Sequence, residues 1–588
     1  MQEKFKRVFS LDYRSLALLR IGLAIILITD LLGRLLDLKA FYTDSGVLPR
    51  SVLFDTFGGD YFWSIHNISG IWQVELIIFI IAIIVAMSLL VGYRTTLATV
   101  ISWILLVSIQ NRNPLIIHAG DTVLRLTIFW AMFLPLGKYM SIDSLKISSN
   151  LNKKTMINGA SFAYVLSIVS FYIFSALMKT GLPWHDGTAV YYALQIDQMS
   201  TRFGHFVLNF PNILSFITYG VLCVELYISL LILSPWKTAI LRIVCITIFV
   251  IMQIGFGSGL HLGLFPFISI IILFGLLPSL FWDSYVQKFK IWINKNNKYN
   301  ITIYYDYNCG FCYRAVHILA RLILLPENIK IIASDENREI GNEMVQINSW
   351  IVINPDGKHL YKTQAFIEIL KSSPIFWPLS YIFNIRFIKI LGDYIYDKIA
   401  QKRLLICVPQ DTKIEKNNIF KKVSSVIVVL LFLYTIAWNI ETLGDGRKII
   451  PEGARIIAYT TRLDQRWGMF APYPRTEDGW YVVPGKLVNG TDVNLFTNEN
   501  SVSYEKPKDV SAMYTSTRWR TYLMNLWLRY YSNYRPSYSR YLCREWNNKH
   551  QGDMKLKSLQ IIFMLEITKP NYEKVGVNKV VLQEYNCF

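Results

Sequence analysis

Long apolar stretches recur through the first 283 residues and constrain the fold more than any other feature of the sequence. About 20 apolar residues suffice to cross the hydrocarbon core of a bilayer as a helix, which satisfies its own backbone polar groups. The chain is therefore predicted to be a polytopic α-helical membrane bundle, with an uncleaved first span. The predicted spans are residues 15–37, 71–91, 95–110, 121–137, 158–178, 213–234, 238–256, 262–282 and 423–440.

The composition agrees with an integral membrane protein that also has soluble parts. Hydrophobic residues make up 53% of the 588 residues, and the net charge is +19. Because Lys and Arg cluster beside the apolar spans, the anionic inner leaflet is favoured over nucleic acid as their partner. The sequence contains no Walker loop, Rossmann glycine pattern, zinc-protease motif or nucleophile elbow, which argues against nucleotide-driven transport.

The loops between the spans alternate in their content of Lys and Arg, which cytoplasmic loops accumulate. With the N-terminus inside the cell, the outer loops before residue 283 hold only Lys39, Arg50, Arg112, Lys179 and Arg202. The bias predicts a multi-pass protein of the cytoplasmic membrane, with the segment after the eighth span inside and residues 441–588 outside. The inner loops and their flanks hold Lys4, Lys6, Arg7, Arg14, Arg94, Lys138, Lys146, Lys153, Lys154, Lys237, Lys288, Lys290, Lys295, Lys298, Lys413, Lys416, Lys421 and Lys422.

A motif with two cysteines, Cys309-Gly-Phe-Cys312, lies between the eighth and ninth spans. Residues 301–305 are β-branched and aromatic, and residues 314–325 carry apolar residues at helical spacing, so a strand is predicted to lead into a helix that the motif opens. A helix N-terminus favours an anion, so Cys309 is expected to lose its proton more readily than a free cysteine. Cys312, one turn later, is placed to resolve a mixed disulfide.

A zinc site is the alternative interpretation of this motif. No second Cys-x-x-Cys is present, and the spacing of the other candidate ligands is irregular. In a reducing cytoplasm a Cys-x-x-Cys is usually catalytic or metal-binding and not a structural disulfide. Dithiol chemistry is therefore favoured over zinc. The residues that would complete a zinc site are Cys407, His317 or His359.

The pattern Asp306-x-x-Cys309-x-x-Cys312 resembles the DCC family of predicted thiol-disulfide oxidoreductases, a thioredoxin-like group. The resemblance covers about residues 299–410 and implies an inserted thioredoxin-like α/β domain whose chemistry rests on Asp306, Cys309 and Cys312. Two later segments extend it: a hairpin with a Pro355-Asp356-Gly357 turn followed by a helix in 349–370, and a helix from Tyr394 to Arg403 that is similar to the family's closing helix.

One departure bears on the activity that the DCC resemblance implies. Thioredoxin places a proline just before the strand that faces its active site, whereas this chain has Ser349-Trp350 at the corresponding place. The departure argues against broad disulfide exchange.

Charged residues inside predicted spans are costly and need partners. Asp30 and Arg34 lie one helical turn apart and are expected to pair, and Asp121 and Arg125 repeat that spacing. Glu225 has no partner within its own span, so it is expected to face a neighbouring helix or a water-filled cavity. Both pairs are interpreted as contacts between helices and not as catalytic groups.

The predicted outer loops resemble the HTTM family, whose best-understood members are the vitamin-K-dependent γ-carboxylases. The segments that carry this resemblance are 112–121, 133–137, 141–143 and 175–187. Lys179 matches the position of the carboxylase's catalytic lysine, and His118 roughly that of its catalytic histidine. The resemblance implies that Lys179, partly desolvated at a helix end, acts as a base toward a hydroquinone, and that His118 binds or polarises the quinone oxygen. The alternatives are a snorkelling lysine and a loop histidine that contacts headgroups.

Residues 441–588 are polar and rich in aromatic side chains, and a β-rich domain is predicted for them. Segments 466–474 and 479–483 also resemble the tail of HTTM proteins. Strand patterns surround an Asn489-Gly490 turn, and another strand is expected over 559–567. The helical stretch 517–546 has two interpretations, packing against the bundle or a peptide-binding surface, and the first is favoured. Cys543 and Cys587 can form a disulfide on the oxidising side of the membrane.

Together these features predict four regions: an HTTM-like bundle (1–283), a cytoplasmic DCC domain (299–410), a ninth span (423–440) and an external β-rich tail (441–588). The expected function is a thiol-disulfide oxidoreductase, linked to a quinone as cofactor, on a γ-carboxylase-like scaffold. The alternative is a non-enzymatic membrane factor for the maturation or export of a secreted peptide, and a third is a glutamate carboxylase-like enzyme. The expected partners are the lipid bilayer and a secreted peptide or a thiol protein.

Overall fold

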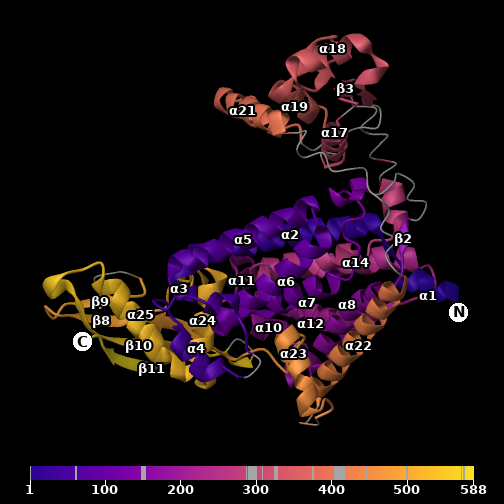
Figure 1. Cartoon of the computed structure of the whole chain (residues 1–588). Helices are drawn as coiled ribbons and strands as arrows, with labels where there is room; N and C mark the ends of the chain where they lie inside the picture. The colour runs from indigo at the N-terminus through magenta and orange to yellow at the C-terminus, as the bar shows by residue number, and fades with distance from the viewer. Residues whose placement is uncertain are drawn as a thin grey trace.

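The computed structural model shows a helical bundle, an inserted α/β domain and a C-terminal domain (Figure 1). Lys153, Arg403, Cys407 and the basic residues at 290–298 and 413–416, which entered the predictions above, lie outside the residues that the structure describes. The described residues are 2–59, 62–146, 154–285, 288, 301–307, 309–322, 329–373, 376–402, 418–444, 446, 448–497, 501–570, 573 and 576–588.

The bundle is built from helices of the first half of the chain together with one helix that follows the insert. A two-stranded antiparallel contact between β1 (Leu11–Asp12) and β2 (Thr155–Met156) closes one end. The bundle helices are α1 (Gln2–Phe9), α2 (Tyr13–Leu36), α3 (Leu38–Tyr42), α4 (Arg50–Phe57), α5 (Trp72–Val91), α6 (Thr95–Arg112), α7 (Ala119–Ala131), α8 (Gly159–Leu177), α9 (Leu182–His185), α10 (Ala189–Leu194), α11 (Arg202–Val207), α12 (Pro211–Cys223), α13 (Ser229–Leu231), α14 (Thr238–Gly259), α15 (Phe265–Phe274) and α22 (Asn418–Leu443).

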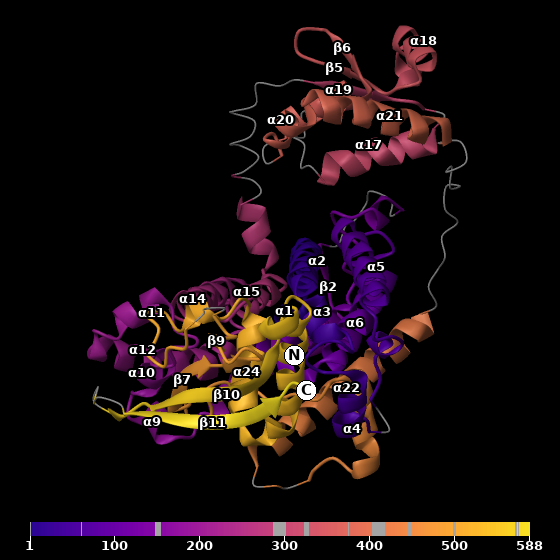
Figure 2. The ribbon, with the colours of Figure 1, turned by 90° about the vertical axis from the view of Figure 1, so that its left-hand side faces the viewer.

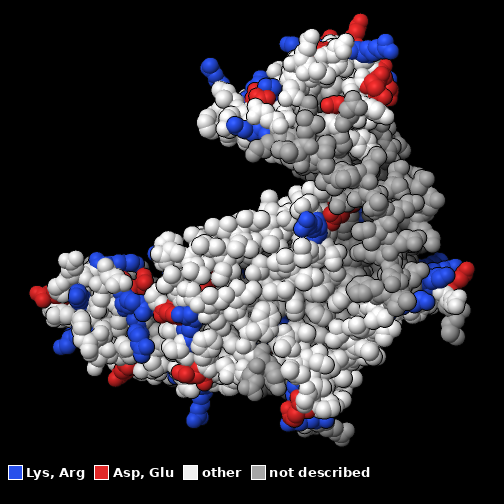
Figure 3. Space-filling view, viewed as in Figure 1, with Lys and Arg blue, Asp and Glu red and all other residues white. Residues whose placement is uncertain are grey.

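Six helices in the described part of the chain are long and apolar enough to cross a membrane, which is compatible with a multi-pass protein. They cover Tyr13–Leu36, Trp72–Val91, Gly159–Leu177, Pro211–Leu231, Thr238–Gly259 and Lys422–Leu443. Large apolar side chains on these helices are exposed, and the space-filling view shows few charged residues over the middle of the bundle (Figure 3). Such a belt fits contact with lipid acyl chains.

Nine spans were predicted, and the difference has local causes. The last turn of α6 is polar, with Gln110, Asn111 and Arg112 all buried inside the protein. Helix α7 has only 13 residues, too few to cross a bilayer alone. Helix α15 ends at Phe274, and the chain turns by 90° into a second helix, 279–285, so the eighth predicted span is a broken one.

The insert holds a four-stranded sheet in the order β4-β3-β5-β6. Strands β3 and β4 are parallel, with Ile303 opposite Ile331, whereas β5 is antiparallel to both β3 and β6. Gly357 has a positive φ of 78° in the predicted turn between β5 and β6. The elements are β3 (Thr302–Tyr305), α17 (Gly310–Leu322), β4 (Lys330–Ala333), α18 (Arg338–Ile347), β5 (Ile351–Ile353), β6 (His359–Tyr361), α19 (Lys362–Lys371), α20 (Leu379–Phe383) and α21 (Arg386–Lys402).

The C-terminal domain contains the small sheet that the sequence predicts for the tail. Strand β10 pairs with β11 on one side, and with β7 and β8 on the other. The Asn489-Gly490 hairpin joins β8 to β9, and Gly490 has a φ of 88°. The elements are α23 (Arg455–Thr461), β7 (Glu477–Val482), β8 (Pro484–Leu487), β9 (Asp492–Asn494), α24 (Thr517–Trp527), α25 (Arg535–Asn547), β10 (Leu556–Ile567) and β11 (Val577–Asn586).

Helix α24 packs the tail against the bundle. The indole N–H of Trp519 donates to Oδ1 of Asp37 at 3.0 Å, and Arg520 donates to the carbonyl oxygen of His261. These contacts agree with the packing interpretation of the stretch 517–546.

A disulfide joins Cys543 to Cys587 across a sequence separation of 44 residues, so the pairing considered from the sequence is present.

Asp478 on β7 makes the attachment of the tail sensitive to pH. Its carboxylate accepts the backbone N–H of Asp197 at 2.5 Å and the side-chain amide of Gln198 at 3.0 Å. Burial, together with the nearby carboxylate of Asp197, raises the pKa of Asp478 to about 7. As the pH rises, the unfolded chain therefore loses this proton first. Asp478 thus contributes stability that is full below about pH 4.

We expect the free energy of unfolding to fall as the pH rises from about 4 to 7, and then to level off. The rise in the pKa of Asp478 from its ordinary value to about 7 corresponds to roughly 4 kcal/mol in the free energy of unfolding. Thermal unfolding of the purified chain across this range, compared with Asp478→Asn, tests the expectation, because the variant should lose most of the dependence. A His205→Gln variant is the control, since the Nε2 of His205 lies 3.6 Å from the carboxylate of Asp197. An unchanged pH profile in Asp478→Asn would contradict the assignment.

Candidate functional site: a dithiol at the start of a helix

Cys309 and Cys312 lie where β3 ends and α17 begins, as the sequence predicts. The backbone N–H of Cys309 donates to the carbonyl oxygen of Asp306 at 3.1 Å, and the N–H of Tyr313 donates to the carbonyl oxygen of Cys309 at 3.1 Å. The first bond closes the turn after β3 and the second starts the helix. Both cysteines are reduced thiols; Cys309 is buried and Cys312 is half-buried.

The sulfur of Cys309 caps the start of α17. The backbone N–H of Cys312 donates to Sγ of Cys309 at 3.2 Å. The first N–H groups of a helix have no partner within the helix, and together with the helix dipole they stabilise negative charge. A thiolate is both the stronger acceptor and the nucleophilic form of cysteine. This geometry suits Cys309 to act as the attacking thiol. Cys312, three residues later, is then placed to resolve the mixed disulfide.

Asp306 completes a group of three potential ligands. One carboxylate oxygen and the two sulfurs lie within 4.8 Å of one another. Structural zinc sites have four ligands, and no fourth His, Cys, Asp or Glu joins this group in the described part of the chain. His317, considered above as a ligand, lies with its Nδ1 2.9 Å from the carbonyl oxygen of Tyr313, and His359 contacts Glu343. The described residues thus bring together a dithiol and an adjacent carboxylate.

Aromatic rings flank the dithiol on α17 and β3. The rings of Tyr313 and His317, one turn apart, lie 4.2 Å between centroids, and that of Tyr305 lies 5.5 Å from Tyr313. Sequence reasoning did not single out Tyr305 and Tyr313 as part of the site. The spacing of four residues between Tyr313 and His317, which places both on one helix face, was the available signal.

Comparison with known protein families identifies the part of the chain that contains the two cysteines. Residues 303–408 match the model of the DCC1-like thiol-disulfide oxidoreductase family. The chain therefore carries a DCC1-like domain between its apolar helices. No curated protein and no solved structure matches the chain.

Lys179, predicted to act as a base, lies in the bundle and away from the DCC1-like domain in sequence. Its ammonium group donates to the carbonyl oxygen of Ser175 at 3.2 Å, to Oγ of Ser175 at 2.7 Å and to Oε2 of Glu225 at 2.5 Å. It also lies 5.1 Å from the ring centroid of Trp184. The buried nitrogen of Lys179 thus has three acceptors within hydrogen-bond distance, which is the number of donors that a lysine side chain offers.

Glu225 explains how a lysine is tolerated here. It lies in a π-helical turn, η4 (Val224–Ile228), between α12 and α13. The turn widens the helix and directs Glu225 toward the end of α8. The expectation that Glu225 faces a neighbouring helix is confirmed, and its partner is Lys179. π-Helical turns are frequent at functional sites, but a buried ion pair is by itself also a packing element.

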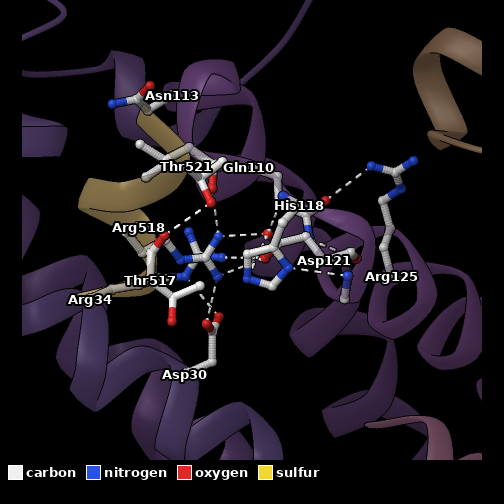
Figure 4. Close-up of polar contacts among 12 residues, drawn as sticks. Asp30, Arg34, Gln110, Asn113, His118, Asp121, Arg125, Thr517, Arg518 and Thr521 are labelled. Carbon is white, nitrogen blue, oxygen red and sulfur yellow. Dashed lines mark hydrogen bonds and ion pairs between the residues drawn. The ribbon is translucent and has the colours of Figure 1, made fainter. Parts of the chain in front are cut away.

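His118 caps the start of α7 and adjoins a buried cluster of charges (Figure 4). Its Nδ1 accepts the N–H of Gly120 at 3.1 Å, and its Nε2 lies 3.7 Å from Oδ2 of Asp121. The contacts of His118 and those of Lys179 involve different residues, so the structure places the two in separate polar clusters. Their catalytic roles stay predictions.

The expected pairing of Asp121 with Arg125 is wrong. Asp121 binds Arg34 at 2.6 Å and Arg518 at 2.5 Å, whereas Arg125 donates to Gln110 and to the carbonyl oxygen of Asp464 (Figure 4). The spacing of four residues puts both side chains on one helix face, but stronger partners come from α2 and α24. The expected pair of Asp30 and Arg34 is present at 2.7 Å.

Arg518 is the residue that sequence reasoning missed. It bridges Asp121 and Asp30, at 2.5 and 2.7 Å, and donates to the carbonyl oxygen of Ile116 at 2.9 Å. Two aspartates and two arginines thus neutralise one another where α2, α7 and α24 meet. The available signal was that the sequence of α24, Thr517–Trp527, holds arginines and no acidic residue.

Replacing Arg518 by Met should leave Asp30 and Asp121 with one buried cation between them. We expect the free energy of unfolding to fall by about 3–5 kcal/mol, because removing one member of a buried ion pair exposes an uncompensated charge. Arg518→Lys should lower the free energy of unfolding by less than Arg518→Met does, since lysine keeps the positive charge but lacks the planar guanidinium group. Thermal unfolding and proteolytic release of the tail measure the effect, and exposed Arg529→Met is the matched control. Equal midpoints for the 518 and 529 variants would contradict the role of the cluster.

Proposed function

We propose that the chain is a membrane-anchored thiol-disulfide oxidoreductase whose reacting group is the Cys309–Cys312 dithiol. The observation that carries the proposal is the sulfur of Cys309 at the start of α17, in the part of the chain that matches the DCC1-like family. The order of strands and helices, with a β4-β3-β5-β6 sheet, supports the thioredoxin-like fold expected for this domain. The bilayer is the partner of the six apolar helices.

The reaction is a two-electron exchange. The thiolate of Cys309 attacks one sulfur of a disulfide in a partner protein, which forms a mixed disulfide and releases the other partner sulfur as a thiolate. Cys312 then loses its proton and attacks Sγ of Cys309. The partner leaves as a dithiol, and Cys309 and Cys312 become joined in a disulfide. A thiol reductant of the same compartment restores the domain, or the reverse sequence oxidises a partner.

Asp306 is the group placed to move the proton in the second step. Its carboxylate oxygen lies within 4.8 Å of both sulfurs. A carboxylate at this position can accept the proton of Cys312, directly or through a water molecule, as that sulfur attacks. Asp306, which the family pattern includes, thereby acts as a general base in this proposal.

Location in the cytoplasmic membrane completes the proposal. The thiols of the DCC1-like domain suit the reducing cytoplasm, and the Cys543–Cys587 disulfide of the tail suits the oxidising side. One candidate membrane helix, Lys422–Leu443 of α22, separates the two in the described part of the chain. An odd number of crossings puts them on opposite faces.

The quinone link, the HTTM-like scaffold and the carboxylase-like or peptide-maturation roles stay predictions. The side-chain nitrogen of Lys179 donates to Glu225 and Ser175, so a role as base requires that these bonds first break. No described contact connects the DCC1-like dithiol with Lys179 or His118.

Replacing either cysteine should separate the two steps of the exchange. In membranes that hold the full chain, Cys312→Ser should accumulate a mixed disulfide with partner proteins, seen as a shift on non-reducing gels that a reductant removes. Cys309→Ser should form none and should lower the rate of reduction of Ellman's reagent at this domain by about 100-fold or more, since the attacking sulfur is gone. Asp306→Asn should slow the release of the mixed disulfide.

Cys245→Ser is the matched control for these variants, because Cys245 is a buried thiol in α14. It should behave as the unmodified chain. A mixed disulfide that forms equally in Cys309→Ser and Cys312→Ser would contradict the assignment of the attacking sulfur.

The proposed topology predicts which cysteines a membrane-impermeant maleimide reaches. In intact cells Cys309 and Cys312 should stay unlabelled, and they should become labelled once the membrane is permeabilised. After reduction from outside, Cys543 and Cys587 should be labelled in intact cells. Labelling of the Cys309 domain in intact cells, checked by mass spectrometry of its peptides, would overturn the orientation.

A further inference from the structure

Helix α21 turns its polar side toward its own domain. Asp393 accepts the backbone N–H of Thr363 at 3.1 Å, and Asp397 forms an ion pair with Lys362 at 2.8 Å. A side chain at Gly392 would come within 2.6 Å of Oγ1 of Thr363, so α21 and α19 approach closely here. Both acidic residues of α21 therefore face inward, against the start of α19.

The opposite side of α21 is apolar and faces outward. Phe387 is 73% exposed, Ile390 63% and Tyr394 61%, with Leu391 and Ile395 beside them. These positions recur every three to four residues, which makes one continuous stripe. A helix on the surface of a water-soluble domain normally has the reverse arrangement, with its apolar stripe inside.

The same surface continues onto α20 and the turn before it. Tyr381 is 70% exposed and Ile385 54%. Contiguous apolar surface of this extent marks an interaction site. We call this surface the α20–α21 face, and its members are Trp377, Tyr381, Ile382, Ile385, Phe387, Ile390, Leu391, Tyr394 and Ile395.

Charge on the α20–α21 face favours an anionic partner. Arg386 and Lys398 are exposed on α21 beside the apolar stripe, and the ammonium of Lys398 lies 5.6 Å from the ring centroid of Tyr394. Since Asp393 and Asp397 are engaged on the inner side, the outward side of α21 is cationic. Tyr and Trp with one polar end, together with Lys and Arg, are the residues enriched at membrane surfaces.

Both ends of the insert lead back to apolar helices of the bundle. The chain runs from Tyr285 to Ile301 before the domain and from Lys402 to Asn418 after it. About 16 residues reach at most roughly 55 Å, so the domain is never far from the bilayer that holds the bundle. Tethering of this kind raises the effective concentration of a surface that binds only weakly alone.

We propose that the α20–α21 face lies on the anionic surface of the bilayer, with the two helices in the interface plane. Figure 2 shows α17, α20 and α21 on one side of the domain and α18 on the other, so docking turns the helix that Cys309 opens toward the membrane. The ligand is the phospholipid surface itself, which takes the aromatic stripe at headgroup depth and pairs its phosphates with Arg386 and Lys398. The docking rests on the proposed placement of the bundle in the membrane and not on the dithiol reaction.

Photocrosslinking of the full chain in lipid nanodiscs tests the docking. The photoreactive residue p-benzoylphenylalanine replaces Phe387, Tyr394, Val345 or Ile84, one at a time, and mass spectrometry detects lipid adducts. Val345 is 79% exposed on α18, away from the face, and Ile84 is 59% exposed on α5 in the bundle. In phosphatidylglycerol-containing discs we expect adducts at 387, 394 and 84, and none at 345.

Removing the negative charge of the lipid, or the positive charge of Arg386 and Lys398, should weaken the docking. The yield of adducts at 387 should fall at least about threefold in discs of phosphatidylcholine alone, and in an Arg386→Gln, Lys398→Gln double variant, since basic residues near an anionic surface are attracted to it. The yield at 84 should not change.

Each other result overturns a defined claim. Adducts at 84 but not at 387 or 394 would leave the bundle in the membrane and reject the docking. Crosslinks from 387 to a second copy, to the bundle or to another protein would assign the face to that partner in place of lipid. Absence of adducts at 84 as well would reject the placement of the bundle in the membrane.

Discussion

The pairing of Arg518 with Asp30 and Asp121 ties the end of the chain to its beginning. These side chains are 488 residues apart in sequence at the widest, yet the distances are 2.7 Å or less. The cluster is buried at the junction of α2, α7 and α24, where an unpaired charge would be strongly unfavourable. Arg34 of α2 and Arg518 of α24 each contact both aspartates, so the position of the tail on the bundle is tied to the burial of these charges. The short helix α7 depends on the same contacts, because its first turn holds Asp121.

A second buried ion pair, between Lys179 and Glu225, joins two segments inside the bundle. Lys179 at the end of α8 and Glu225 in the π-helical turn neutralise each other, and Trp184 covers the ammonium. Glu225 lies in the π-helical turn of residues 224–228, so a local change of the helix and the buried ion pair coincide at one place. The same pair occupies the side-chain nitrogen of Lys179, so a role as base would require that this contact first breaks.

Features set by neighbouring residues could be predicted from the sequence. The strand, Cys-x-x-Cys and helix succession, the hairpin at Asn489-Gly490 and the Asp30–Arg34 pair all depend on spacings of a few residues. The partners of Asp121, Arg125 and Lys179 could not be predicted, because they come from segments that are distant in the chain. Periodicity likewise predicts apolar helices, but does not show that α7 is short or that the chain bends by 90° after α15.

The inserted domain is attached at both ends to helices of the bundle, and this constrains its position relative to the membrane. Five candidate crossings precede it, and the bent pair around Phe274 is a sixth if it counts as one crossing. Under the proposed placement of these helices in a bilayer, six crossings put the N-terminus and the insert on the same face, and the single helix α22 puts the tail on the other face. The Cys309–Cys312 dithiol and the Cys543–Cys587 disulfide would then lie on opposite sides of the bilayer. The outward apolar stripe of α21 belongs to a domain that is joined at both ends to apolar helices.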